Sequence, residues 1–207
     1  MNASTLPRSS MLATDEVGDL AALFEPWCNI ALLRRPMGAE LEKAALNLAQ
    51  ATWSEIRVTL HHDGEAFDLT PVEEALAPLA GEGAITLARD LAWSSELLMD
   101  LTGAESVGVR LTRLVRPACP SFHYDRVGLR LVTTYLGPGT ELRPHRTPKD
   151  TATSPGGLTD EVHTTQAGDL VWLKGTVWPG NEERGAVHRS PMTEGGTVRV
   201  MASLDPL

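Results

Sequence analysis

Residues 119–135 read CPSFHYDRVGLRLVTTY and place two metal-ligating side chains just ahead of a strand-like run. His123 and Asp125 stand two positions apart. On an extended chain, residues i and i+2 point to the same face, so both side chains can reach one metal ion. The run 129–136 that follows is rich in Leu, Val and Thr and ends at a Gly-Pro-Gly turn, which predicts a β-strand.

A third ligand is expected from a later segment, GAVHRSP at 185–191, which carries His188. Two imidazoles and one carboxylate leave half of an octahedron open, an arrangement that suits a non-haem Fe(II) oxygenase. A catalytic zinc site with the same ligands also keeps a position open for water. The ligand types alone do not separate these two kinds of site.

The chain holds a second His-x-Asp pair, His61 and Asp63, so the motif by itself is weak evidence. Context distinguishes the two copies. The second pair follows a helical pattern and runs into Gly64, and we interpret it as a solvated helix end. The metal site is therefore predicted at 119–135.

The chain resembles the Fe(II)- and 2-oxoglutarate-dependent dioxygenases, in particular their prolyl-hydroxylase-like branch. The resemblance covers about half of the chain, residues 107–204, and its pieces follow the order of the family. These pieces are the metal pair HYD at 123–125, the strand RLVTTYL at 130–136, the turn and strand GDLVWL at 168–173, the distal histidine in HRSP at 188–191, and TVR at 197–199.

The resemblance implies a role for each matched residue. His123, Asp125 and His188 would hold Fe(II) as the catalytic centre, while Tyr135 and Arg199 would bind 2-oxoglutarate. The implied reaction decarboxylates 2-oxoglutarate to succinate and oxidises a C–H bond of a small-molecule or protein side-chain substrate. The implied fold is a jelly roll of the cupin kind, or double-stranded β-helix.

The chemistry of Arg199 fits this role independently. On the strand predicted at 197–204 it shares a face with Thr197, Met201 and Ser203, while the alternate residues are apolar. A guanidinium holds a carboxylate with two hydrogen bonds and keeps its charge. A basic residue on an otherwise core-like strand needs an anionic partner. A structural salt bridge is the alternative.

Two other functions stay open at this point. The C-terminal half also resembles a bacterial domain family of unknown function, which implies a link to zinc-responsive regulation and keeps a non-enzymatic zinc-binding protein of metal homeostasis as the alternative. A zinc hydrolase would need a general base beside the metal-bound water. Glu141, Glu182 and Glu183 are candidates for that base without motif support.

The predicted organisation is α+β, with an N-terminal helical region packed on a double-stranded β-helix. Residues 1–14 are expected to be a flexible N-terminus, 15–103 a helical region and 104–207 the metal-binding core. Apolar residues repeat at helical spacing over 41–51, Pro71 opens a second helix, and a third over 84–101 ends at Gly103.

Strands are predicted at 107–115, 129–136, 170–173, 185–189 and 197–204. The segment 137–168 is expected to be a loop over the site, and its histidines, His145 and His163, to be solvated. Arg110 is expected on the exposed edge of the first strand, and Cys119 is expected to be buried.

Composition limits the partners. The net charge of −9 argues against nucleic acid, because phosphate binding needs a basic surface. No apolar run is long enough for a signal peptide or a membrane span, so we expect a cytoplasmic protein without a membrane partner. Two distant cysteines imply no disulfide framework.

Overall fold

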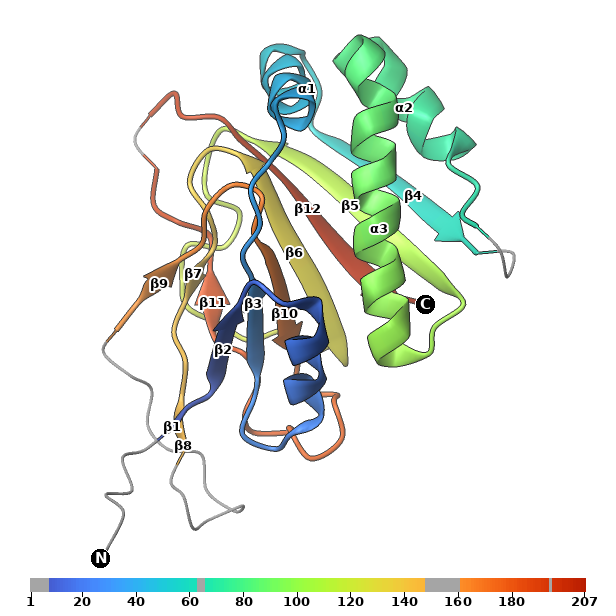
Figure 1. Ribbon diagram of the computed structural model, residues 1–207. Coiled ribbons are helices and arrows are strands. Elements are labelled where there is room, and N and C mark those ends of the chain that lie inside the picture. Colours follow the sequence, from blue (N-terminus) through green and yellow to red (C-terminus); the bar gives the residue numbers. More distant parts are fainter. Residues whose placement is uncertain (1–7, 63–65, 148–160, 194) are drawn as a thin grey trace, which may run out of the picture.

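The computed structural model describes residues 8–62, 66–147, 161–193 and 195–207. Three α-helices cover one face of a seven-stranded sheet, and a small sheet lies on the other side (Figure 1). The α+β class expected from the sequence is therefore confirmed, with a large, mainly antiparallel sheet at its centre.

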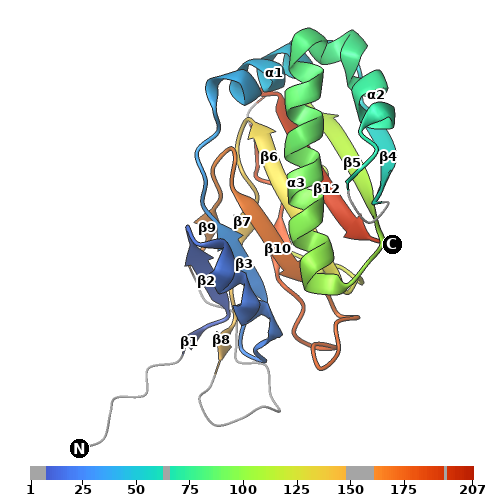
Figure 2. The same cartoon turned by 45° about the vertical axis from the view of Figure 1, so that its right-hand side comes forward.

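The helices lie where the sequence predicts them. They are α1 (Ala39–Gln50), α2 (Thr70–Ala80) and α3 (Ala84–Thr102), and α3 crosses β6, β12 and β5 (Figure 2). Gly103 ends α3 with a left-handed φ of 71°, and its N–H donates to the Met99 carbonyl at 2.7 Å. That conformation favours glycine, which explains why the helix stops there.

The large sheet has the strand order β2-β3-β10-β6-β12-β5-β4. All neighbouring strands are antiparallel except β2 and β3. The strands are β2 (Met11–Thr14), β3 (Ile30–Leu33), β4 (Glu55–His61), β5 (Ser106–Leu114), β6 (Leu129–Leu136), β10 (Leu170–Lys174) and β12 (Arg199–Pro206).

The small sheet is three-stranded and covers only part of the large one. Its order is β11-β7-β9, with β7 (Glu141–Leu142), β9 (His163–Thr164) and β11 (His188–Arg189). Leu142 and Ala186 pack there against side chains of β3, β6 and β10. The remaining short elements are β1 (Arg8–Ser9) paired with β8 (Arg146–Thr147), and the 3-10 helices η1 (Val17–Phe24) and η2 (Gly81–Gly83).

Strand alternation separates a core face from a second face on the central strands. Val200, Ala202 and Leu204 of β12 are fully buried against the helices. Arg199, Met201 and Ser203 point to the opposite face, as the sequence pattern predicts. The second face of β12, β5 and β6 is the floor on which the candidate site stands.

The helical region expected at 15–103 also contains two strands of the large sheet. In β4, Ile56, Val58 and Leu60 alternate with polar residues, which is the period of a strand and not of a helix. All four residues of β3 are buried, and periodicity alone does not distinguish such a short apolar run from a helix. The predicted boundary at 103/104 thus does not divide the sheet from the helices.

Two N-terminal predictions also need correction. Within the expected flexible segment 1–14, β1 pairs with β8 and β2 pairs with β3, because the backbone hydrogen bonds of a neighbouring strand hold them; residues 1–7 lie outside the described part. His61 ends strand β4 rather than a helix, and Asp63 is outside the described residues. Among the described residues, no helix has the length and apolar character needed to cross a membrane.

Candidate metal centre and the adjoining cavity

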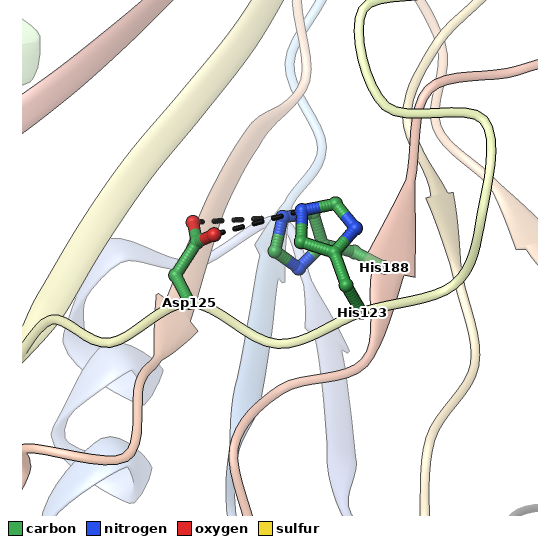
Figure 3. A group of neighbouring side chains, drawn as sticks. All are labelled: His123, Asp125 and His188. Atoms are coloured by element: carbon green, nitrogen blue, oxygen red, sulfur yellow. Dashed lines mark ion pairs between the residues drawn. The ribbon is translucent and has the colours of Figure 1, made fainter.

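The three predicted metal ligands come together. His123 and Asp125 lie on the segment between β5 and β6, and His188 is the first residue of β11 (Figure 3). The two histidines form an isolated antiparallel bridge, in which the N–H of each donates to the carbonyl of the other at 3.0 and 2.9 Å. This backbone pairing brings residues 65 positions apart in sequence to one point.

The donor atoms face one another. One ligand atom from each residue lies within 4.8 Å of the other two. Nε2 of His123 is 3.6 Å from Oδ1 of Asp125, and Nε2 of His188 is 3.6 Å from Oδ2 (Figure 3). These separations leave room for a metal ion between the three side chains.

Backbone carbonyls orient both imidazoles. Nδ1 of His123 lies 3.0 Å from the Ser121 carbonyl, and Nδ1 of His188 lies 3.0 Å from the Ala186 carbonyl. A carbonyl only accepts, so each Nδ1 carries the proton and each Nε2 presents a lone pair to the site. Burial lowers the pKa of His188, which favours the neutral, ligating form.

Arg130 holds the Asp125 carboxylate in place. Its Nη1 donates to Oδ2 of Asp125 at 2.7 Å, while its Nε and Nη2 donate to the two oxygens of Asp205 at 2.7 and 2.8 Å. Burial would lower the pKa of Arg130, but the hydrogen bonds and charges of Asp205 and Asp125 raise it overall. Asp125 is thereby oriented by a guanidinium that is itself fixed to β12.

A cavity of about 320 Å³ adjoins the three ligands. Its floor is the second face of β5, β6 and β12, and it includes Arg110, Arg130, Arg199 and Ser203. The size lies at the lower end of the range of small-molecule sites. Glu141, Glu182 and Glu183 are not among its lining residues, and Glu141 instead accepts from Nε of Arg189 at 2.5 Å, so none of these three candidate bases lies in the cavity.

Arg199 lies in this cavity as expected, and it is only 3% exposed. Its Nη2 donates to the hydroxyls of Thr134 at 3.0 Å and Thr140 at 2.7 Å, and its Nη1 approaches that of Ser190 at 3.4 Å. Its Nε is buried without a partner, and no carboxylate of the described residues lies within 4.0 Å of the guanidinium. Burial lowers the pKa of Arg199 to about 10.

Tyr135, which the family resemblance assigns to 2-oxoglutarate, does not line the cavity. It is fully buried on the helix face of β6, where its hydroxyl donates to Oδ2 of Asp90 at 2.8 Å. The reason is strand alternation, because Thr134 faces Arg199 and residue 135 must then point to the other side of the sheet. Burial, together with the Asp90 charge, raises the pKa of Tyr135 well above its ordinary value.

Several residues of the cavity were not predicted as site residues. Arg110 lines it instead of standing on an exposed edge, since β4 pairs outside β5. The alternation of Arg110 with Leu111 predicts a strand with one polar and one apolar face. It does not predict that the polar face lines a cavity. Thr134 and Thr140 bind Arg199, and Cys119 is exposed at the cavity instead of buried.

The expected loop 137–168 contains three short strands, and residues 148–160 lie outside the described part. His163 is part of β9 and His145 precedes β8. Neither belongs to the metal-ligand group or lines the cavity. Turn residues alone do not predict that this segment supplies two strands of the small sheet, β7 and β9.

Comparison with known proteins identifies one protein family that matches the chain, and solved structures of similar fold. A family model described as "Protein of unknown function (DUF1826)" matches residues 14–205. None of the curated protein sequences compared with the chain matches it.

Solved structures of similar fold are Fe(II)- and 2-oxoglutarate-dependent oxygenases, which bears out the resemblance to that superfamily. The dioxygenase for auxin oxidation of rice is 15% identical, with 86% of this chain and 73% of that chain covered and a TM-score of 0.53. Dioxygenase for auxin oxidation 1 of Arabidopsis thaliana, solved with 2-oxoglutarate, is 12% identical, with 98% and 94% covered and a TM-score of 0.57. At these identities the similarity shows the fold alone.

Proposed function

Because the chain belongs to the DUF1826 family, whose description assigns no reaction, we propose its function from the site itself: an Fe(II)-dependent oxygenase that consumes 2-oxoglutarate. The observation that supports this most strongly is Arg199, a buried guanidinium in the same cavity as the three ligands. The proposal thus depends on a site for a small anion beside a metal site.

The surroundings of Arg199 favour a dissociable carboxylate over a structural salt bridge. Burying a charge without an anionic partner is costly. Hydroxyls orient the guanidinium, but they do not neutralise it, and its Nε is left without an acceptor. The far carboxylate of 2-oxoglutarate would supply both the negative charge and the hydrogen-bond acceptor through a bidentate hydrogen bond.

The donor set fits Fe(II). His123, Asp125 and His188 would hold the ion and leave adjacent positions open. When bound, the ion would supply the redox chemistry. Overall, 2-oxoglutarate, dioxygen and a substrate C–H would give succinate, carbon dioxide and a substrate C–OH. The chain's own part is to orient the ligands through Ser121, Ala186 and Arg130.

We further infer that the two facing sheets are those of a double-stranded β-helix. Strands β5, β12, β6 and β10 would form one side, and β11, β7 and β9 the other. The cluster of Ile30, Val132, Leu142 and Val171 between them supports this assignment. The metal ligands would then lie at the open end of the roll.

The alternative of a zinc protein rests on the same three donors, and no separate observation favours it. A sensor or storage site for zinc gives no reason for an unneutralised guanidinium beside the metal. We propose that the substrate is either a small molecule or a protein side chain.

The test is an anaerobic titration of the metal-free protein with Fe(II) and then 2-oxoglutarate, followed by the visible charge-transfer band of the chelate. We expect a band that needs both additions. Arg199→Ala should weaken 2-oxoglutarate binding by about 10- to 100-fold, because a charge-assisted hydrogen-bonded pair is lost, and leave Fe(II) affinity unchanged.

Two variants serve as controls. His188→Ala should lose the band by losing the metal, and Arg199→Lys should retain part of the 2-oxoglutarate affinity, since it keeps the charge but not the planar fork. If Arg199→Ala lost metal and 2-oxoglutarate together, Arg199 would be a structural residue. Metal binding without any band, with zinc held more tightly than iron, would favour the zinc alternative.

A further inference from the structure

Arg110 on β5 is another cationic residue of the cavity. Arg110 lies opposite Ser203 of β12 on one side and opposite Arg57 of β4 on the other. Its Nε donates to the Ser203 hydroxyl at 3.2 Å, which turns the guanidinium over the cavity floor. The small sheet packs against β3, β6 and β10, and the apolar cluster between the two sheets includes no residue of β5.

Most charges around the cavity are matched. Arg130 binds Asp205 and Asp125, Arg189 binds Glu141 at 2.5 Å, and Glu55 binds the Nε of Arg57 at 2.5 Å. Among the described residues, two guanidinium groups of the cavity have no carboxylate within 4.0 Å, and these are Arg199 and Arg110.

The strand register places Arg110 beside another arginine, which lowers the stability of the fold. Arg57 and Arg110 are directly opposite on neighbouring strands, and like charges in such a pair are destabilising. Glu55, which also lines the cavity, pairs with Arg57 and acts electrostatically on Arg110 as well, but no ion pair within 4.0 Å joins it to Arg110. A bound anion on Arg110 would remove the conflict.

One 2-oxoglutarate molecule does not satisfy both arginines. Arg110 is paired with Ser203, four residues along β12 from Arg199, a strand length of about 13 Å. In the proposed function, the divalent ion and Arg199 together carry three positive charges, which Asp125 and the two carboxylates of 2-oxoglutarate balance. Arg110 then shares the Glu55 carboxylate with Arg57 and has no ion pair of its own among the described residues.

We propose that Arg110 binds a carboxylate of the substrate and that the substrate is therefore a small organic acid. This inference rests on the proposed function, which assigns Arg199 to 2-oxoglutarate. The two Nη groups of Arg110 are available for a bidentate hydrogen bond, since the side-chain hydrogen bond that Arg110 makes among the described residues is that from Nε to Ser203. A cavity of about 320 Å³ that also holds 2-oxoglutarate accommodates a small acid.

The experiment measures binding rather than turnover. The protein is loaded with Mn(II) and 2-oxoglutarate under argon, and calorimetry gives the Kd of small monocarboxylates and of their neutral amides. The probes are the pairs phenylacetate and phenylacetamide, hexanoate and hexanamide, and cyclohexanecarboxylate and its amide. We expect the acid of at least one pair to bind about 10- to 100-fold more tightly than its amide.

Arg110→Met should abolish that preference and leave the Kd of 2-oxoglutarate unchanged, which also shows that the variant is folded. Arg89→Met removes the same charge from an exposed position on α3, away from the cavity, and should keep the preference. Equal binding of acid and amide in every pair, or a preference that survives Arg110→Met, would overturn the proposal. Loss of the proposed function shows separately, as failure of 2-oxoglutarate to bind in the loading step.

Discussion

At the scale of single residues, strand alternation determines which neighbours reach the site. Thr134 and Tyr135 are adjacent on β6, yet one binds Arg199 in the cavity and the other binds Asp90 among the helices. Asp90 also accepts from Nη2 of Arg35 at 3.0 Å, so it ties β6, α3 and the segment before α1 together. The contacts of Tyr135 thus predict a structural role for its hydroxyl.

Tyr135→Phe should therefore lower the free energy of unfolding by about 1 kcal/mol, the usual effect of one lost hydrogen bond, because Asp90 keeps Arg35. The affinity for 2-oxoglutarate should not change. Urea unfolding and the anaerobic titration measure the two quantities. A tenfold loss of 2-oxoglutarate affinity at unchanged stability would restore the role that the family pattern predicts for Tyr135.

At the scale of elements, the turn after β10 supports the segment that carries Asp125. Gly175 donates its N–H to the Gly128 carbonyl at 2.9 Å, and a Cβ at Gly175 would lie 2.2 Å from the Val127 carbonyl oxygen and 2.7 Å from that of Asp125. Both contacts are with backbone, so the segment itself would have to move. Close packing here positions the carboxylate ligand from behind.

Gly175→Ala should weaken Mn(II) or Fe(II) binding by about 10- to 100-fold, the usual cost of disturbing the groups that orient a ligand. Gly128→Ala is the matched control in the same segment, because its Cβ would meet no atom within 4 Å. Metal titration by calorimetry compares the two variants. Equal affinities would show that the 125–127 backbone tolerates the shift.

Elements with a clear hydrophobic period can be predicted from the sequence. Elements whose structure depends on a neighbouring strand cannot. Helices α1 to α3 and strands β5, β6, β10 and β12 follow from local pattern, and so does the face of Arg199. Strand β3 is uniformly apolar, and its identity depends on pairing with β10 and β2. The cavity position of Arg110 likewise depends on β4, which covers the edge of β5.

At the scale of the whole molecule, one buried charge joins η1 to the end of β10. Lys174 is 3% exposed, its Nζ donates to the Glu25 carbonyl at 3.2 Å, and it lies 5.1 Å from the centre of the Trp178 ring. Burial lowers its pKa from 10.5 to about 8. Between these two pH values the unfolded chain holds a proton that the folded chain has released.

The free energy of unfolding contributed by Lys174 should therefore rise with pH across this window, since stability increases wherever the unfolded state binds more protons. From pH 7.5 to 9.5 the gain relative to Lys174→Met should be about 1–2 kcal/mol, measured by urea unfolding of both proteins. The variant removes the titrating group and keeps the apolar stem against Trp178, so subtraction cancels the other ionisable groups. Parallel pH profiles would mean that Lys174 reaches water in the folded protein.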